Sequence, residues 1–133
     1  MNKKTAFLNE IVMAGYPKKE VILGLDAFFT GNNDPCSIGV NLEPQLTPKE
    51  FYDVLLKIRS FSKTENIFVR ISDVEDTDWF YTDTVYITGE WTLEEIKKMT
   101  EVLSPSEIYD GWMYGKPINI PETLTKVHSI WWD

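Results

Sequence analysis

The sequence has one cysteine, Cys36, and one histidine, His128, among its 133 residues. A single cysteine excludes an internal disulfide framework and is typical of a reducing compartment. These two side chains are also too few for a zinc site built from cysteine and histidine. No local signature of a Cys–His catalytic pair surrounds either residue. We therefore expect no metal, no cofactor and no enzymatic activity.

Long apolar runs are also missing. No segment approaches the length of about 20 apolar residues that a membrane-spanning helix needs. The N-terminus is basic at Lys3 and Lys4, but Asn9 and Glu10 interrupt the segment that follows, unlike the core of a signal peptide. We expect a soluble, cytoplasmic protein that does not bind membranes.

Basic side chains are scarce as well, with 13 lysines and arginines against 21 acidic residues and a net charge of −8. This balance disfavours binding to a nucleic-acid backbone or an anionic membrane surface, and it permits a basic protein partner. Hydrophobic residues make up 43% of the chain, too many for a disordered segment. The length fits one core, so we predict a single domain over residues 1–133.

Two short motifs mark helix starts. Thr-Pro-Lys-Glu at 47–50 and Thr-Leu-Glu-Glu at 92–95 each place a glutamate three residues after a threonine. In such a capping box, the threonine hydroxyl accepts from the glutamate amide and the glutamate side chain accepts from the threonine amide. The motifs predict helices over 48–60 and 93–103.

The remaining elements follow from apolar spacing. A further helix is predicted over 3–14, and residues 111–121 are predicted to be irregular. Strands are predicted at 21–29, 37–42, 67–71, 84–88, 106–109 and 127–132, with the first two forming a hairpin.

The strand patterns predict an α/β (α+β) fold. Apolar residues alternate with polar or mixed ones, which is typical of a sheet that helices cover on one face only. We expect a two-layer sandwich, with a mixed, mainly antiparallel sheet and both capped helices on the same face. A ferredoxin-like βαββαβ order, extended by the N-terminal helix and a hairpin strand, satisfies this requirement. The exact strand order stays open.

The polar face of this sheet is the first candidate site. By alternation it collects aromatic and polar residues that resemble a partner-binding surface, namely Asp26, Phe28, Asn41, Phe68, Arg70 and Tyr86. Alternatively, the N-terminal helix or residues 111–132 cover this face and form a second small core.

An acidic segment at 73–78 is the second candidate. Its carboxylates are Asp73, Glu75, Asp76 and Asp78. It lacks the glycine and glutamate spacing of an EF-hand calcium loop. Such a segment is either simply solvated or docks on a basic protein surface.

Two regions of the chain resemble small uncharacterised bacterial proteins. The first comprises residues 103–112, 115–117 and the terminal Trp-Trp-Asp, and the second comprises 31–34 and 37–42. Small size, acidity and the lack of catalytic residues are similar to the immunity proteins of bacterial toxin systems. The resemblance implies a non-enzymatic, intracellular module that neutralises a more basic partner.

Two other functions stay open. One is a small-molecule-binding domain or enzyme with a pocket at the open sheet face, where Asp26, Asn41, Arg70 and Tyr86 would supply polar groups. The other is a structural or assembly protein that acts as a homo-oligomer.

Overall fold

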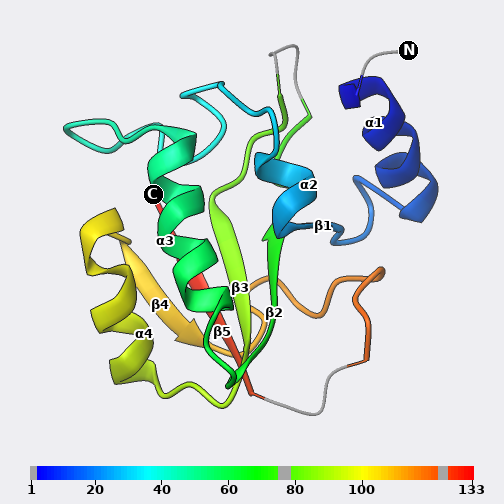
Figure 1. Cartoon of the computed structure of the whole chain (residues 1–133). Coiled ribbons are helices and arrows are strands. Elements are labelled where there is room, and N and C mark those ends of the chain that lie inside the picture. Colours follow the sequence, from blue (N-terminus) through cyan, green and yellow to red (C-terminus); the bar gives the residue numbers. More distant parts are fainter. Residues whose placement is uncertain (1–2, 75–78, 123–125) are drawn as a thin grey trace.

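The computed structural model describes residues 3–74, 79–122 and 126–133 (Figure 1). Its elements are α1 (Lys3–Ala14), β1 (Ile22–Gly24), α2 (Leu25–Phe29), α3 (Pro48–Arg59), β2 (Thr64–Arg70), β3 (Thr84–Gly89), α4 (Leu93–Thr100), the 3₁₀ helix η1 (Glu101–Leu103), β4 (Glu107–Asp110) and β5 (Lys126–Trp131). No described helix has the length and apolar character needed to cross a bilayer.

The strands form one sheet in the order β1-β2-β3-β5-β4, and every neighbouring pair is antiparallel. Figure 1 shows α3 and α4 side by side against the same face of this sheet. Between these layers lies the main core, in which Val69, Val85 and Ile130 of the sheet meet Phe51 and Leu55 of α3. The predicted two-layer sandwich with both capped helices on one face is therefore confirmed.

The connection order differs from the ferredoxin-like one that we considered. β3, α4 and β4 form a βαβ unit with β5 inserted between its two strands, as in a split βαβ. From α3 onward the chain runs αββαββ rather than βαββαβ, and β1 adds a fifth strand beside β2. The predicted strand at 106–109 is the edge strand β4, and the predicted closing strand is β5, which lies inside the sheet.

Both helix starts use their threonine as an N-cap. The Thr47 hydroxyl accepts from the Glu50 amide at 3.2 Å, and the Thr92 hydroxyl accepts from the Glu95 amide at 3.2 Å. Only at Thr92 does the glutamate side chain complete the box, accepting from the threonine amide at 2.9 Å. Glu95 also forms an ion pair with Lys63, which precedes β2. This second partner fixes the start of α4 to the sheet.

The capping box makes stability depend on pH. The hydrogen bond from Lys63 and that from the Thr92 amide lower the pKa of Glu95 from 4.5 to about 2. Because the folded-state pKa is depressed, the stabilisation is complete above the ordinary pKa and is lost as the pH falls toward 2. We expect a carboxyl ¹³C titration of Glu95 with a midpoint near 2. Over this acid range, the Glu95→Gln variant should lose less stability than the parent protein does.

Glu94→Gln is the matched control, because within the described part of the chain the Glu94 carboxylate on the same turn meets Lys97 alone, at 3.9 Å. This variant should keep the acid dependence of the parent protein. A Glu95 midpoint near 4.5 would show that the box does not hold the carboxylate.

The predicted strand at 21–29 is wrong beyond its first residues. Only Ile22–Gly24 is a strand, and Leu25–Phe29 is the short helix α2. Adjacent Phe28 and Phe29 both lie in the main core, whereas a strand would turn them to opposite faces. Helical spacing also lets Phe29 stack on Tyr52 of α3, with ring centroids 5.2 Å apart.

The predicted strand at 37–42 is also wrong, and with it the leading hairpin. Among residues 3–74, 79–122 and 126–133, this segment makes one isolated bridge, which is parallel, between Ile38 and Thr82. Gly39 has φ +63 and its Cα lies so close to Phe51 that an added Cβ would meet the ring at 2.6 Å. The segment therefore turns at Gly39 and packs against α3, because only glycine fits there without strain.

Candidate functional site

The predicted polar face of the sheet is covered rather than open. Phe68 of β2 is paired with Tyr86 of β3, and with Ile22 they form a second small core. Residues Trp112, Ile120 and Val127 pack against this core. We call residues 111–122, which link β4 toward β5 across this face, the strap. Of the two covers considered from the sequence, the segment after residue 111 is the one that forms the second core.

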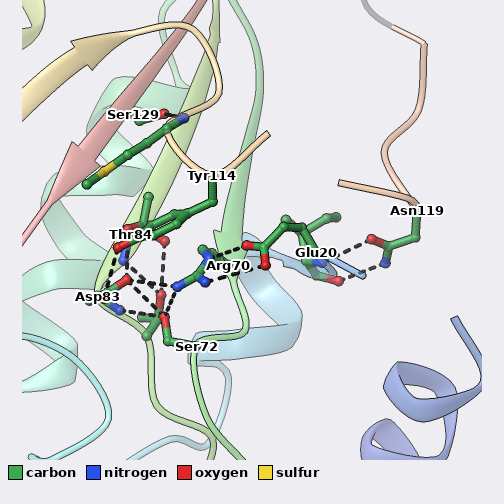
Figure 2. A network of polar contacts seen from close by, with 11 residues as sticks. Glu20, Arg70, Ser72, Asp83, Thr84, Tyr114, Asn119 and Ser129 are labelled. Atoms are coloured by element: carbon green, nitrogen blue, oxygen red, sulfur yellow. Dashed lines mark hydrogen bonds and ion pairs between the residues drawn. The ribbon is translucent and has the colours of Figure 1, made fainter. Parts of the chain in front are cut away.

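Arg70 is the centre of the polar contacts beneath the strap (Figure 2). Its Nε donates to Glu20 at 2.5 Å, and its Nη1 lies 3.2 Å from an Asp83 oxygen. Ser72 bridges the two sides, since its hydroxyl accepts from Arg70 at 3.0 Å and donates to Asp83 at 2.9 Å. The Arg70 side chain is 14% exposed, so both carboxylates compensate a largely buried charge.

Tyr114 of the strap closes this cluster from above. Its ring centroid lies 3.6 Å from the Arg70 guanidinium carbon, a cation–π contact, and its hydroxyl donates to Asp83 at 3.4 Å. Burial and the Asp83 charge raise the pKa of Tyr114. Burial acts to lower the pKa of Arg70, but the Glu20 hydrogen bond and the two carboxylate charges raise it overall. The Arg70 cluster thus holds the strap in place through its contacts with Tyr114.

Two further ties fix the strap at its ends. The Asn119 side chain accepts from the Ile22 amide at 3.0 Å and donates to the Ile22 carbonyl at 2.9 Å. At the other end, the Ser129 hydroxyl donates to the Gly111 carbonyl at 2.6 Å and accepts from the Met113 amide at 3.0 Å. Figure 2 shows Asn119 and Ser129 on either side of the Arg70 cluster.

The structure separates the six predicted face residues. Phe68, Arg70 and Tyr86 share the strap-covered face, where Tyr86 is fully buried. Burial raises the pKa of the Tyr86 hydroxyl, which has no hydrogen-bond partner among the described residues. These three side chains are therefore not an exposed patch.

The other three predicted residues lie off the sheet, because the segments that carry them are not strands. Asp26 is exposed on α2, where a hydrogen bond from Tyr52 and one from Arg59 lower its pKa. Phe28 lies in the main core, and Asn41 is exposed in a loop and donates to the Asp133 carbonyl at 3.1 Å.

The acidic segment 73–78 is described only at its first residues. Asp73 forms an antiparallel bridge with Tyr81, which brings the two sides of the connection between β2 and β3 together. Glu75, Asp76 and Asp78 lie outside the described residues, so their predicted role stays a prediction. Within the described part of the chain, no three acidic, histidine or cysteine side chains gather as a metal site.

A surface cleft of about 570 Å³ lies at the end of the sheet where α4 begins. Residues 91–93, 110–112 and 126–128 line it, and we call this set the cleft. Its position follows from β5 lying between β3 and β4. The start of β5 is thereby placed beside the end of β4 and near the residues that follow β3.

The two tryptophans of the cleft are held rigidly. Trp91, just before the Thr92 cap, packs edge-on against Phe61 and donates its indole N–H to Thr64 at 2.9 Å. Trp112, the second residue of the strap, packs edge-on over Tyr86 with ring centroids 4.8 Å apart. Trp91 is buried and Trp112 is partly exposed, so Trp112 supplies most of the aromatic surface.

His128 and Asp110 form the polar part of the cleft. Their side chains lie 3.1 Å apart, and they are paired across β4 and β5 on the face that α4 covers. His128 is 3% exposed whereas Asp110 is 81% exposed. The histidine therefore positions a carboxylate that projects into solvent. Lys126 contributes a cation at the rim.

Comparison with known proteins gives the chain a family. The model described as "Uncharacterized protein YfbO family" matches residues 2–131. The chain belongs to the YfbO family. The predicted relationship to a small bacterial family is confirmed at this level. "Uncharacterized protein YfbO" of Escherichia coli (strain K12) is 29% identical over 115 residues, covering 84% of this chain and 82% of the relative. No solved structure matches.

The YfbO family match spans the strap and the cleft alike, since both lie within residues 2–131. The sequence analysis did not identify the cleft, whose three segments are far apart in the chain. Two local signals were present. A tryptophan directly precedes the Thr92 cap, and a glycine followed by a tryptophan, Gly111 and Trp112, comes directly after β4.

Proposed function

We propose that the chain is a non-enzymatic, cytoplasmic binding module that neutralises a more basic protein partner, as immunity proteins do. The observation that carries this proposal is the cleft, whose lining includes both the exposed Asp110 carboxylate and the partly exposed Trp112 ring. An indole face and a carboxylate together favour a lysine or arginine side chain. Aromatic anchors beside charges are also typical of protein interfaces.

The surrounding charge supports a basic partner. Glu90, Glu94 and Asp110 are exposed at this end of the molecule. Among the described residues, Lys126 lines the cleft, and Lys63 lies 4.3 Å from the centroid of the Trp91 ring. The net charge of −8 adds long-range attraction that would speed association with a basic protein. His128 supports a binding rather than a catalytic role, because its ring is buried and Nε2 is held by Asp110.

A small-molecule ligand is the second candidate, favoured by the volume of the cleft, which lies in the range of ligand sites. The polar groups first proposed for such a pocket do not converge there. Arg70 and Tyr86 lie under the strap, while Asp26 and Asn41 lie on α2 and in a loop.

Capture on the immobilised protein tests the proposed function. The lysate should contain the product of the neighbouring gene as well as cellular proteins. We expect retention of a protein with a pI well above 4.6, and its release by salt. Asp110→Lys and Trp112→Ala should each weaken this retention about tenfold or more, because they remove the carboxylate or the aromatic surface.

Glu10→Lys is the matched control, since it makes the same charge change at an exposed position of α1, which Figure 1 shows on the opposite side of the molecule from α4 and β4. The double change Asp76→Lys and Asp78→Lys tests the acidic segment separately. Failure to retain any basic partner would reject the proposed function. Equal losses of retention in Asp110→Lys and Glu10→Lys would show that the cleft is not the binding surface.

A further inference from the structure

The two edge strands of the sheet differ in whether their outward main-chain groups have hydrogen-bond partners. At the β1 edge, both outward main-chain groups of Ile22 are bonded to the Asn119 amide of the strap. Asn119 thus occupies the place that a neighbouring strand would take. At the β4 edge, the described residues contain no such cover, and Figure 1 shows β4 as the last strand on its side.

Specific main-chain groups of β4 face outward. In an antiparallel ladder, alternate residues bond to the neighbouring strand and the residues between them point away. The Gly111 amide donates to the Val127 carbonyl at 2.8 Å. By alternation, the main-chain groups of Gly111, Tyr109 and Glu107 therefore point toward β5. The N–H and C=O groups of Ile108 and Asp110 therefore point away from the sheet, and these are the groups that an added strand bonds.

We propose that the β4 edge receives an extended basic segment of a partner protein as an added antiparallel strand. This inference rests on the proposed function and names how the partner is held. Main-chain hydrogen bonds to Ile108 and Asp110 would supply affinity, and side chains on alternate faces would supply specificity.

Charge identifies the occupant. Glu107 and Asp110 are both exposed, and their side chains project from opposite faces of the strand. An added antiparallel strand places one residue opposite Asp110 and another, three positions later, opposite Glu107. Opposite charges at such directly facing positions are stabilising. The partner segment is therefore expected to carry basic residues three positions apart.

The same charges disfavour a second copy of this chain. When two β4 strands pair antiparallel, outward residues face outward residues, for example Ile108 of one copy opposite Asp110 of the other. No basic residue of β4 then faces the carboxylates, and the two copies, each with a net charge of −8, repel each other. A basic strand removes this repulsion.

The β4 edge is flanked by concave surface at both ends. A groove of about 300 Å³ runs beside residues 104–108 and includes Lys97 and Glu101, and the cleft begins at Asp110. The residue that precedes the basic segment would enter the cleft beside Trp112. The proposed strand is thus continuous with the binding surface of the proposed function.

A synthetic peptide tests this arrangement. Its core is lysine–threonine–valine–lysine, with blocked ends and glycine–serine flanks. The first lysine then lies opposite Asp110, valine opposite Ile108, and the last lysine opposite Glu107. By calorimetry and NMR titration up to millimolar peptide, we expect binding, slower amide exchange at Ile108 and Asp110, and clear weakening in Glu107→Lys but not in Glu10→Lys.

Main-chain methylation separates strand addition from charge attraction. N-methyl groups on the first and third core residues block the amides that face β4, and should weaken binding by at least about tenfold. Methyl groups on the second and fourth residues, whose amides face away, are the matched control and should leave binding nearly unchanged.

Equal affinities of the two methylated peptides, or unchanged exchange at Ile108 and Asp110, would overturn strand addition while leaving charge-based binding at the cleft in place. Absence of any peptide binding would also overturn strand addition. The proposed function is decided independently by the capture experiment, which uses a whole partner protein.

Discussion

Arg70→Ala is expected to lower the free energy of unfolding by about 3 kcal/mol. The change leaves the Glu20 and Asp83 carboxylates without their shared cation, although their side chains are only 29% and 21% exposed. It also removes the cation–π contact with Tyr114, one of the ties that hold the strap over the second core. Urea unfolding monitored by circular dichroism measures the loss.

Arg59→Ala is the control for this prediction. Arg59 pairs with Asp26 at 2.9 Å, but both side chains are more than 40% exposed. Exposed ion pairs contribute about 0–1 kcal/mol, so this variant should lose little. Adding Glu20→Gln to Arg70→Ala should recover part of the stability, because it removes one uncompensated charge. Similar losses of unfolding free energy for Arg70→Ala and Arg59→Ala would contradict a stabilising role of the Arg70 cluster.

Gly89→Ala should be about as damaging, with a loss of about 3 kcal/mol or more. Gly89 has φ +145, and a Cβ there would lie 2.1 Å from the Lys63 carbonyl oxygen. That oxygen already accepts from the Glu90 amide at 2.9 Å, so moving it breaks a hydrogen bond at the end of the β2–β3 pair. Urea unfolding again measures the effect.

Gly24→Ala is the matched control, since Gly24 has φ −65 and an added Cβ would meet no atom within 4 Å. Its stability should stay within about 0.5 kcal/mol of the parent protein. The cleft should also respond in Gly89→Ala, because Trp91 follows two residues later. NMR shifts of the Trp91 indole should move in this variant. An unperturbed stability would refute the steric argument.

Local sequence signals were sufficient to predict a helix or strand wherever a single hydrophobic period dominated the segment. The threonine caps and amphipathic spacing predicted α3 and α4, and clean alternation predicted β2 and β3. The strand β5 was predicted from a terminal apolar segment. Residues 21–29 carry two periods at once. Their alternation suits a strand, but Leu25, Phe28 and Phe29 also have helical spacing, and packing against α3 favours the helix.

The candidate site was less predictable for a different reason. Arg70 and Tyr86 were placed correctly on one face, yet the sequence alone did not decide whether that face was open. The strap covers it through side-chain contacts from Tyr114 and Asn119, residues in an irregular segment with no periodicity. The cleft and the β4 edge depend on strand order, which long-range pairing determines.

The closure of one sheet edge by Asn119 limits how this protein can assemble. A sheet with two free edges can add a further copy at each side, and such head-to-tail growth has no natural end. Here the β1 edge is already occupied at Ile22 by a side chain from the same molecule. Any association through strand pairing must therefore use the β4 side alone, and it stops after one added chain instead of continuing into a filament.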